Sequence, residues 1–221
     1  MAFDNGYTYR KLITIDHSKI SGGADLTNFP VLVSFTDAAF KSVANGGKVQ
    51  HSSGYDIRFE LKDGTQLKHE LELYVNTTGQ VIAWVKMPTL HYNSDDAIYI
   101  YYGKSGLSAT EEDVANVWTA FVGVYHLNEA SGASSGIKDR TSNANHMTEV
   151  GSYLTYAQAG KINKAVDRSA TNDVLSRLIT DRNMNLPAGA LTYMIWAKLS
   201  TSSQKSNGQL LWQADSGRFR I

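Results

Sequence analysis

Glu70 and Glu72 are the residues whose spacing comes nearest to a catalytic arrangement. They stand at positions i and i+2, so a strand would place both carboxylates on one face, about 6.5–7 Å apart. Glycoside hydrolysis uses two carboxyl groups roughly 5–10 Å apart. The same pair also fits a solvated strand face with His69, Leu71 and Leu73 directed inward. We favour the solvated face and expect no catalytic residue here.

One loop carries oxygen-bearing side chains at alternate positions, as a calcium loop does. These side chains are Asp139, Thr141, Asn143 and Asn145. Ala144 stands where an EF-hand has its glycine, and Val150 replaces the bidentate glutamate. A turn in which Asp139 binds its own backbone explains the pattern better. We therefore expect no cofactor, with calcium at Asp139, Asn143 and Asn145 as the alternative.

Other signatures of catalysis or metal binding are missing from the sequence. The six histidines have neither HxH nor HxxxH spacing, and the chain has no cysteine for a thiolate zinc site or a nucleophile. No Gly-x-Ser-x-Gly elbow, P-loop or dinucleotide fingerprint occurs. The sequence predicts a protein that is not an enzyme.

Aromatic residues offer a second kind of site. Tyr99 and Tyr101 fall on one face of an expected strand, where exposed rings can stack on sugars. We take both as candidate glycan-binding residues together with Trp212, although packing at a strand end is an alternative role for Tyr101. Trp84 and Trp196 stand in strand motifs, and we expect each to anchor the core of a separate domain.

Composition and charge exclude several classes. Hydrophobic residues make up 42% of the 221 positions, which is globular composition. The 21 basic and 21 acidic residues balance, so nucleic acid is not an expected partner. The N-terminus does not resemble a signal peptide, and no apolar run approaches the roughly 20 residues of a membrane span.

These candidate residues must be positioned by strands. Alternating or apolar runs separated by turn residues recur at short intervals, which is typical of a sandwich or barrel. In the first half they cover residues 9–15, 30–35, 56–61, 67–75, 80–87 and 97–102. Asp63-Gly64 marks a tight turn, after which residues 67–75 are expected to pair with residues 56–61. Short helices are expected at residues 37–44 and 109–118.

A stretch rich in glycine and serine, residues 103–110, indicates a domain boundary. Strands are expected beyond it, with a long polar loop at residues 128–145. The expected strands are residues 121–127, 153–157, 165–168, 174–178, 191–199, 210–213 and 218–221.

Five motifs in residues 5–105 resemble those of a bacterial and phage domain family of unknown function. They are YRKLITI (9–15), LTNFPV (26–31), GYDIRF (54–59), IAWVKMP (82–88) and IYYG (100–103). The second half resembles the start of a laminin-G-like or concanavalin-A-like module. Its motifs are VYHLNE (124–129), KDRTSN (138–143), GKINKAV (160–166) and LTYMIWAK (191–198).

These resemblances imply an all-β fold with two consecutive antiparallel β-sandwich, jelly-roll-like domains. The expected organisation is a first sandwich at 1–105, a linker with a short helix at 106–117, and the N-terminal part of a second sandwich at 118–221. Such modules have further strands after the tryptophan-containing one. We therefore expect the natural chain to continue past Ile221, or a neighbouring subunit to supply strands beside Phe219 and Ile221.

The modules resemble those of extracellular proteins, yet the sequence shows no export signal. A viral origin would explain both features, because viral proteins assemble inside the cell. The leading expectation is a non-enzymatic virion protein of a phage or related virus with a fibre, decoration or adhesion role. Its expected partners are further copies of itself, other virion proteins and a host-surface glycan. The alternatives are a carbohydrate-binding module of a bacterial surface or secreted protein, and a glycan hydrolase.

Overall fold

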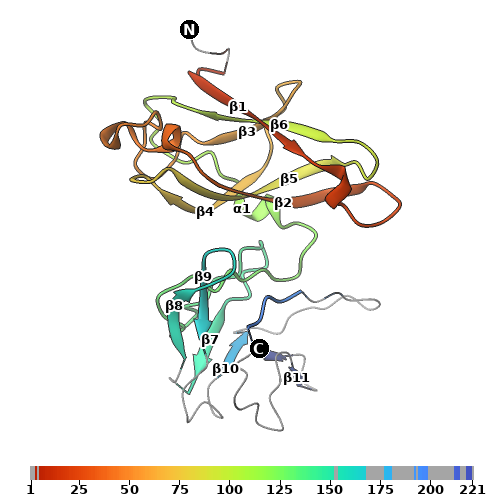
Figure 1. Cartoon of the computed structure of the whole chain (residues 1–221). Coiled ribbons are helices and arrows are strands. Elements are labelled where there is room, and N and C mark those ends of the chain that lie inside the picture. Colours follow the sequence, from red (N-terminus) through yellow and green to blue (C-terminus); the bar gives the residue numbers. More distant parts are fainter. Residues whose placement is uncertain are drawn as a thin grey trace. The chain divides into compact units, whose positions relative to one another are not determined.

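The computed structural model describes residues 3, 5–151, 154–167, 192 and 194–198, and the backbone of residues 177–180, 212–214 and 218–220. The chain divides into two compact units, residues 1–120 and 121–221 (Figure 1). In the part of the chain that the structure describes, no helix has the length and apolar character needed to cross a membrane.

Unit 1 is built from two three-stranded antiparallel sheets (Figure 1). The first has the order β1-β6-β3, with β1 at Tyr9–Ile15, β6 at Asp96–Tyr102 and β3 at Arg58–Leu61. The second has the order β2-β5-β4, with β2 at Leu26–Thr36, β5 at Gln80–Leu90 and β4 at His69–Val75. The helical segments are η1 (His17–Lys19), η2 (Ala38–Phe40), η3 (Val43–Asn45) and α1 (Val114–Val117).

The two sheets share one apolar core, because alternate residues of each strand point inward. Val33 of β2, Val85 of β5, Phe59 of β3 and Ile100 of β6 all belong to this core. On β1, Tyr9, Ile13 and Ile15 pack against it, while Leu12 on the other face is 53% exposed. The expected all-β class and the six strands expected in this half are confirmed.

The expected hairpin between residues 56–61 and 67–75 is wrong. The turn forms, since Leu61 donates its N–H to the Thr65 carbonyl at 2.9 Å. Only one isolated bridge, Glu60 with Gln66, follows it, and the chain then crosses to the other sheet. β3 pairs instead with β6, and β4 pairs with β5. β5 and β6 are therefore the central strands of the two sheets.

The segment expected to be a linker, residues 106–117, belongs to unit 1. Its Asp113 N–H donates to the His69 carbonyl on β4 at 3.0 Å, and its Glu112 carboxylate accepts the Leu71 N–H at 2.6 Å. These contacts extend the first unit to residue 120, beyond the boundary expected at residue 105. The expected helix at 109–118 is shortened to the single turn of α1.

Unit 2 contains shorter strands. The sheet ordered β11-β12-β10-β7 has β11 at Trp212–Ala214, β12 at Arg218–Arg220, β10 at Arg177–Thr180 and β7 at Met147–Val150. A separate pair comprises β8 (Thr155–Ala159) and β9 (Lys164–Asp167). Buried Ile137 and Met147 form a small core with Tyr125, Leu127, Leu154 and Tyr156 around it.

Unit 2 departs from the expected strands in two places. Residues 121–127 form no strand, and β7 follows the polar loop instead. Residues 192 and 194–198 also have no strand partner. The final strand, β12, lies between β10 and β11, so its backbone has a partner on both sides within this chain. The side chains of Phe219 and Ile221 lie outside the described residues.

Candidate functional site

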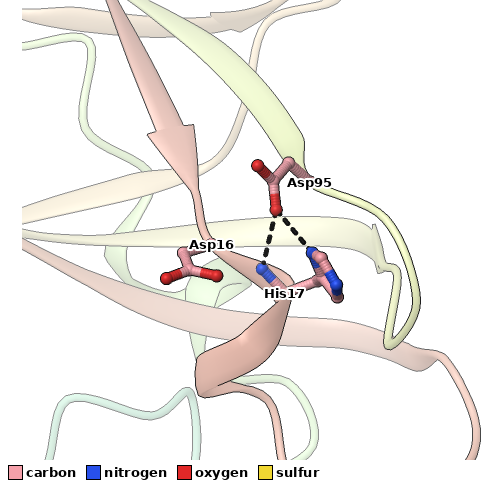
Figure 2. Close-up of side chains that lie close together, drawn as sticks. All are labelled: Asp16, His17 and Asp95. Carbon is pink, nitrogen blue, oxygen red and sulfur yellow. Dashed lines mark hydrogen bonds and ion pairs between the residues drawn. The ribbon is translucent and has the colours of Figure 1, made fainter.

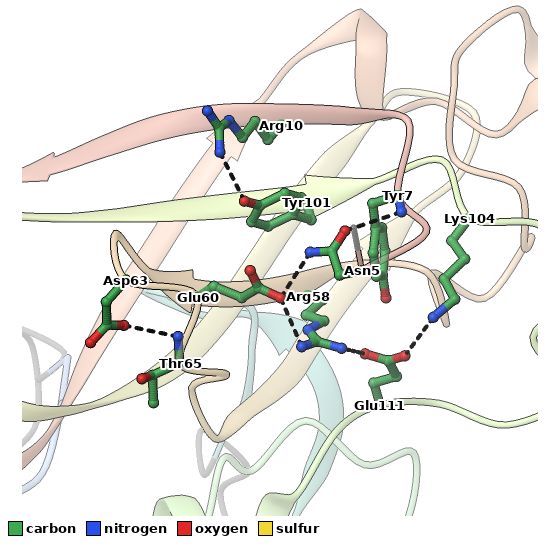
Figure 3. A network of polar contacts seen from close by, with 10 residues as sticks. All are labelled: Asn5, Tyr7, Arg10, Arg58, Glu60, Asp63, Thr65, Tyr101, Lys104 and Glu111. Atoms are coloured by element: carbon green, nitrogen blue, oxygen red, sulfur yellow. Dashed lines mark hydrogen bonds and ion pairs between the residues drawn. The ribbon is translucent and has the colours of Figure 1, made fainter. Parts of the chain in front are cut away.

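Tyr101 lies on the outer face of the β1-β6-β3 sheet, with the Arg10 side chain directed toward its hydroxyl (Figure 3). It is only 5% exposed, and its hydroxyl accepts a 3.0 Å hydrogen bond from the Arg10 guanidinium. The rings of Phe3 and Tyr7 stand edge-on to it at 5.4 and 5.9 Å between centroids. A sugar cannot stack on a ring covered in this way, so Tyr101 is not part of an open glycan platform.

Tyr99, its neighbour on the same strand face, is partly exposed. The Arg10 guanidinium lies 4.2 Å from the centroid of its ring, within the range of a cation–π contact. Arg10 therefore occupies one face of Tyr99. Of the two tyrosines expected to bind glycans, only Tyr99 retains accessible surface.

Charged side chains that form ion pairs lie next to Tyr7 and Tyr101 (Figure 3). Arg58 contacts Glu60 at 2.7 Å and Glu111 at 3.2 Å, and Lys104 approaches the other oxygen of Glu111 at 3.8 Å. Burial, with the Glu111 carboxylate nearby, raises the pKa of Tyr7 well above its ordinary value. The network fastens residues 104–111 to β3.

The two glutamates considered for hydrolysis bind tryptophan indoles. Trp118 donates its Nε1–H to Glu70 at 2.6 Å, and Trp84 donates to Glu72 at 2.8 Å. The two indoles meet edge to face at 5.2 Å. Glu70 is 0% exposed, so the expected solvated face is wrong. The physical reason is that α1 and Trp118 cover this face of β4 and β5, which a reading of β4 alone does not reveal.

Trp84 is consequently not an anchor between the sheets. It is partly buried on the outer face of β5, opposite Glu70 on β4, and it packs against Trp118. The inward neighbours of Trp84 on β5 are Ala83 and Val85, both fully buried.

Asp16, His17 and Asp95 form a surface cluster (Figure 2). The His17 backbone N–H and ring Nδ1 both contact Asp95 Oδ1, at 3.0 and 2.6 Å. Asp16 accepts the Ser18 N–H at the start of η1, and the hydrogen bonds lower the pKa of both aspartates. These residue types can bind divalent cations, but here their hydrogen bonds tie η1 to the loop before β6. Strand pairing of Ile15 with Asp96 brings Asp95 to this place, a proximity that sequence spacing did not indicate.

The loop considered for calcium is organised by Asp139. Its Oδ1 accepts N–H groups of Val124 and Thr141 at 3.0 Å each, and its Oδ2 accepts the Thr141 hydroxyl and the Asn145 N–H at 2.9 Å each. Asn143 is exposed and donates its side-chain amide to the Val122 carbonyl. Both oxygens of Asp139 thus bind the chain itself, which is the turn arrangement preferred above.

Unit 2 contains two tryptophans, Trp196 and Trp212. Trp196 is 68% exposed, so the expectation that it anchors a core is wrong in this structure. Burial of that indole would need paired strands around it, and residues 194–198 form none. Trp212 belongs to β11, and its side chain lies outside the described residues.

A groove of about 520 Å³ runs between β1 and β2, the edge strands of the two sheets of unit 1. Apolar side chains of both strands line it, and an ion pair of Lys11 with Asp37 lies along it. Lys11 lowers the pKa of the Asp37 carboxyl below its usual range. Leu12 and Leu32 are exposed on these strands, at 53% and 37%. The groove depends on which strands become edges, a tertiary property that the sequence pattern does not indicate.

Comparison with known proteins relates part of the chain to a family. Residues 53–138 match the model of a family described as a domain of unknown function (DUF2341). The matched stretch starts before β3, contains three of the five motifs noted above, and ends in the first loop of unit 2. Searches of curated proteins and of solved structures gave no match. Over residues 53–138 the chain is therefore similar to a domain whose function is unknown, as the motifs indicated.

Proposed function

We propose that this protein is a non-enzymatic structural protein of a virion, in a phage or a related virus, with a fibre, decoration or adhesion role. One observation carries the proposal. The acidic residues that could serve catalysis are used to hold unit 1 together, while the β1–β2 side leaves two strand edges and an apolar groove at the surface. Such a surface suits assembly better than turnover.

The resemblance of the second half to the start of a laminin-G-like or concanavalin-A-like module supports the same proposal. A neutral chain without cysteine can assemble in a reducing cell interior and function after lysis. The proposed partners are other virion proteins and further copies of this chain.

Mass spectrometry of purified particles tests the virion role. We expect peptides from both units in a fixed ratio to the major capsid protein across independent preparations. Their loss during density-gradient purification, while the capsid peptides stay, would contradict the proposal.

Glycan binding is a second candidate, favoured by the accessible surface of Tyr99 beside the Arg10 guanidinium. A glycan array probed with the full chain should give signals that Tyr99→Ala abolishes. Thr14→Ala serves as the control, because Thr14 lies on the neighbouring strand β1 and on the same outer face of the sheet as Tyr99. Equal signals for Tyr99→Ala and the unmodified chain would place any glycan site elsewhere.

A further inference from the structure

The two sides of the unit 1 sandwich differ in whether the outer backbone groups of their edge strands are hydrogen-bonded. On one side the chain covers its own edges: Leu67 donates its N–H to the Phe59 carbonyl of β3 at 2.8 Å, and Asp113 donates to the His69 carbonyl of β4 at 3.0 Å. On the other side, within the described residues, β1 bonds only β6 and β2 bonds only β5 through the backbone. Free edges of this length are templates for pairing with another strand.

The direction of the free backbone groups of β2 follows from its neighbour. Lys86 of β5 donates its N–H to the Lys68 carbonyl, away from β2, at 2.9 Å. Its opposite residue on β2 is Pro30, so the backbone at Pro30 points outward. Since hydrogen-bonding direction alternates along a strand, Leu32, Ser34 and Thr36 also point their N–H and C=O groups outward.

Pro30 limits how this edge can be used. Proline lacks the N–H that its outward position would present, so complete pairing is confined to the stretch that begins after it. That stretch, residues 31–36, reads VLVSFT and carries no charge. Its outer side chains, Leu32, Ser34 and Thr36, are exposed.

We propose that β2 pairs antiparallel with β2 of a second copy of this chain, with the two-fold axis at Ser34. Leu32 of each copy then lies opposite Thr36 of the other, and the three outward residues form about six backbone hydrogen bonds. Centring the axis on Val33 would place Pro30 opposite Thr36 at both ends of the pairing, where the missing N–H of proline allows one bond in place of two. The two β2-β5-β4 sheets become one continuous sheet, and the apolar groove lies next to the new interface.

The distribution of charged residues favours pairing with a second copy at the β2 edge and disfavours it at the β1 edge. Residues 31–36 bring no charges together, and the chain as a whole is neutral, with 21 basic and 21 acidic residues, so copies do not repel at long range. A two-fold pairing of β1 would gather Arg10 and Lys11 of both copies in adjacent strands, where like charges oppose association. This inference does not depend on the protein being part of a virion.

A single cysteine provides a direct test, because the chain has none of its own. Under mild oxidation, Ser34→Cys in the full chain should give a disulfide-linked dimer, since directly opposite bonded residues lie about 5.5 Å apart at Cα, within disulfide range. Leu12→Cys on the β1 edge is the matched control and should stay monomeric in non-reducing gels. Cross-linking of Leu12→Cys in place of Ser34→Cys would assign the interface to β1 and overturn the proposal.

Ser34→Pro supplies the complementary measurement. It removes an outward N–H but no hydrogen bond to β5, so the circular dichroism spectrum should stay unchanged. The dimer should lose two intermolecular hydrogen bonds, one from each copy. We expect dimerisation to weaken about 30-fold in sedimentation, with Leu12→Pro unchanged. A monomeric unmodified chain at high concentration, or a Ser34→Pro variant that dimerises normally, would refute the pairing. A monomer that binds a different protein at this edge would refute it equally.

Discussion

His69 is an imidazole buried between the sheets without a hydrogen bond. It is 0% exposed, neither ring nitrogen has a partner, and its ring lies 5.2 Å from that of Phe59. Burial lowers its pKa from 6.5 to about 4. A lowered histidine pKa means that the unfolded chain binds the proton first. The stability from neutral His69 is therefore complete above pH 6.5 and is lost as pH falls toward 4.

We predict that His69→Leu reduces the acid sensitivity of unit 1. Between pH 7 and pH 5 the unmodified chain should lose about 2 kcal/mol more stability than the variant. At pH 7 the variant should be at least as stable, because two unpaired polar atoms are removed. Urea titrations followed by the amide NMR signals of β5 and β6 measure this. Equal losses in both proteins would show that His69 is not the titrating group.

Trp118 contributes to stability through one hydrogen bond and its packing. Trp118→Phe removes the indole N–H that donates to Glu70 at 2.6 Å, and both residues are buried. The free energy of unfolding of unit 1 should therefore fall by about 3 kcal/mol. The matched change Trp84→Phe removes a donor from Glu72, which is only partly buried, and should cost about 1 kcal/mol. The same NMR-detected titrations compare the two. The reverse order of costs would contradict the assigned roles.

At the scale of elements, Asp56 joins three parts of unit 1. Its buried carboxylate accepts N–H groups from Gln50, His51 and Gly103 at 2.7, 2.9 and 3.0 Å. These bonds connect the loop after η3, the start of β3 and the end of β6. Gly103 has a φ of 87°, and a Cβ there would lie 2.6 Å from the Tyr9 ring. The GYDIRF and IYYG motifs thus meet at one structural junction.

Asp56→Asn should destabilise unit 1 by about 3 kcal/mol, because the amide keeps one accepting oxygen and turns a donor toward the remaining N–H groups. Asp63→Asn is the control, since Asp63 is exposed and caps a single turn residue. Amide hydrogen exchange of β6 reports the change. Unaltered protection in Asp56→Asn would show that the junction is dispensable.

Much of unit 1 could be predicted from its sequence, and the reasons are physical. In β1, Tyr9, Ile13 and Ile15 recur on one face because that face packs against the core, and the bounds of this strand agree with the pattern. The partner of a strand is a tertiary property, so Asp63-Gly64 gave the correct turn and the wrong hairpin. The surroundings of Glu70 and Tyr101 also escaped prediction, because Trp118 and Phe3 cover them from distant parts of the chain. In unit 2, the motif around Trp196 suggested a strand, and its described residues, 192 and 194–198, form none.

At the scale of the whole molecule, the extent of unit 1 can be tested by truncation. A fragment of residues 1–120 retains Trp118 and the covering segment and should fold alone. A fragment of residues 1–105 loses both, which leaves Glu70 without its indole donor and the β4 edge bare. We expect dispersed NMR spectra from the longer fragment and a collapsed or aggregated product from the shorter. A well-folded 1–105 fragment would place the boundary where the motifs end.

The pairing of β1 with β6 has a consequence for biosynthesis. Ile15 pairs with Asp96 and Tyr9 with Tyr102, so the first strand made waits for the last strand of its sandwich. Contacts so distant along the chain slow folding, because loop closure must precede the gain from pairing. On the ribosome, the nascent chain cannot complete this sheet until Tyr102 has emerged, and the edge of β4 stays uncovered until Asp113 follows. During that interval unpaired strands are open to chaperones and to neighbouring nascent chains.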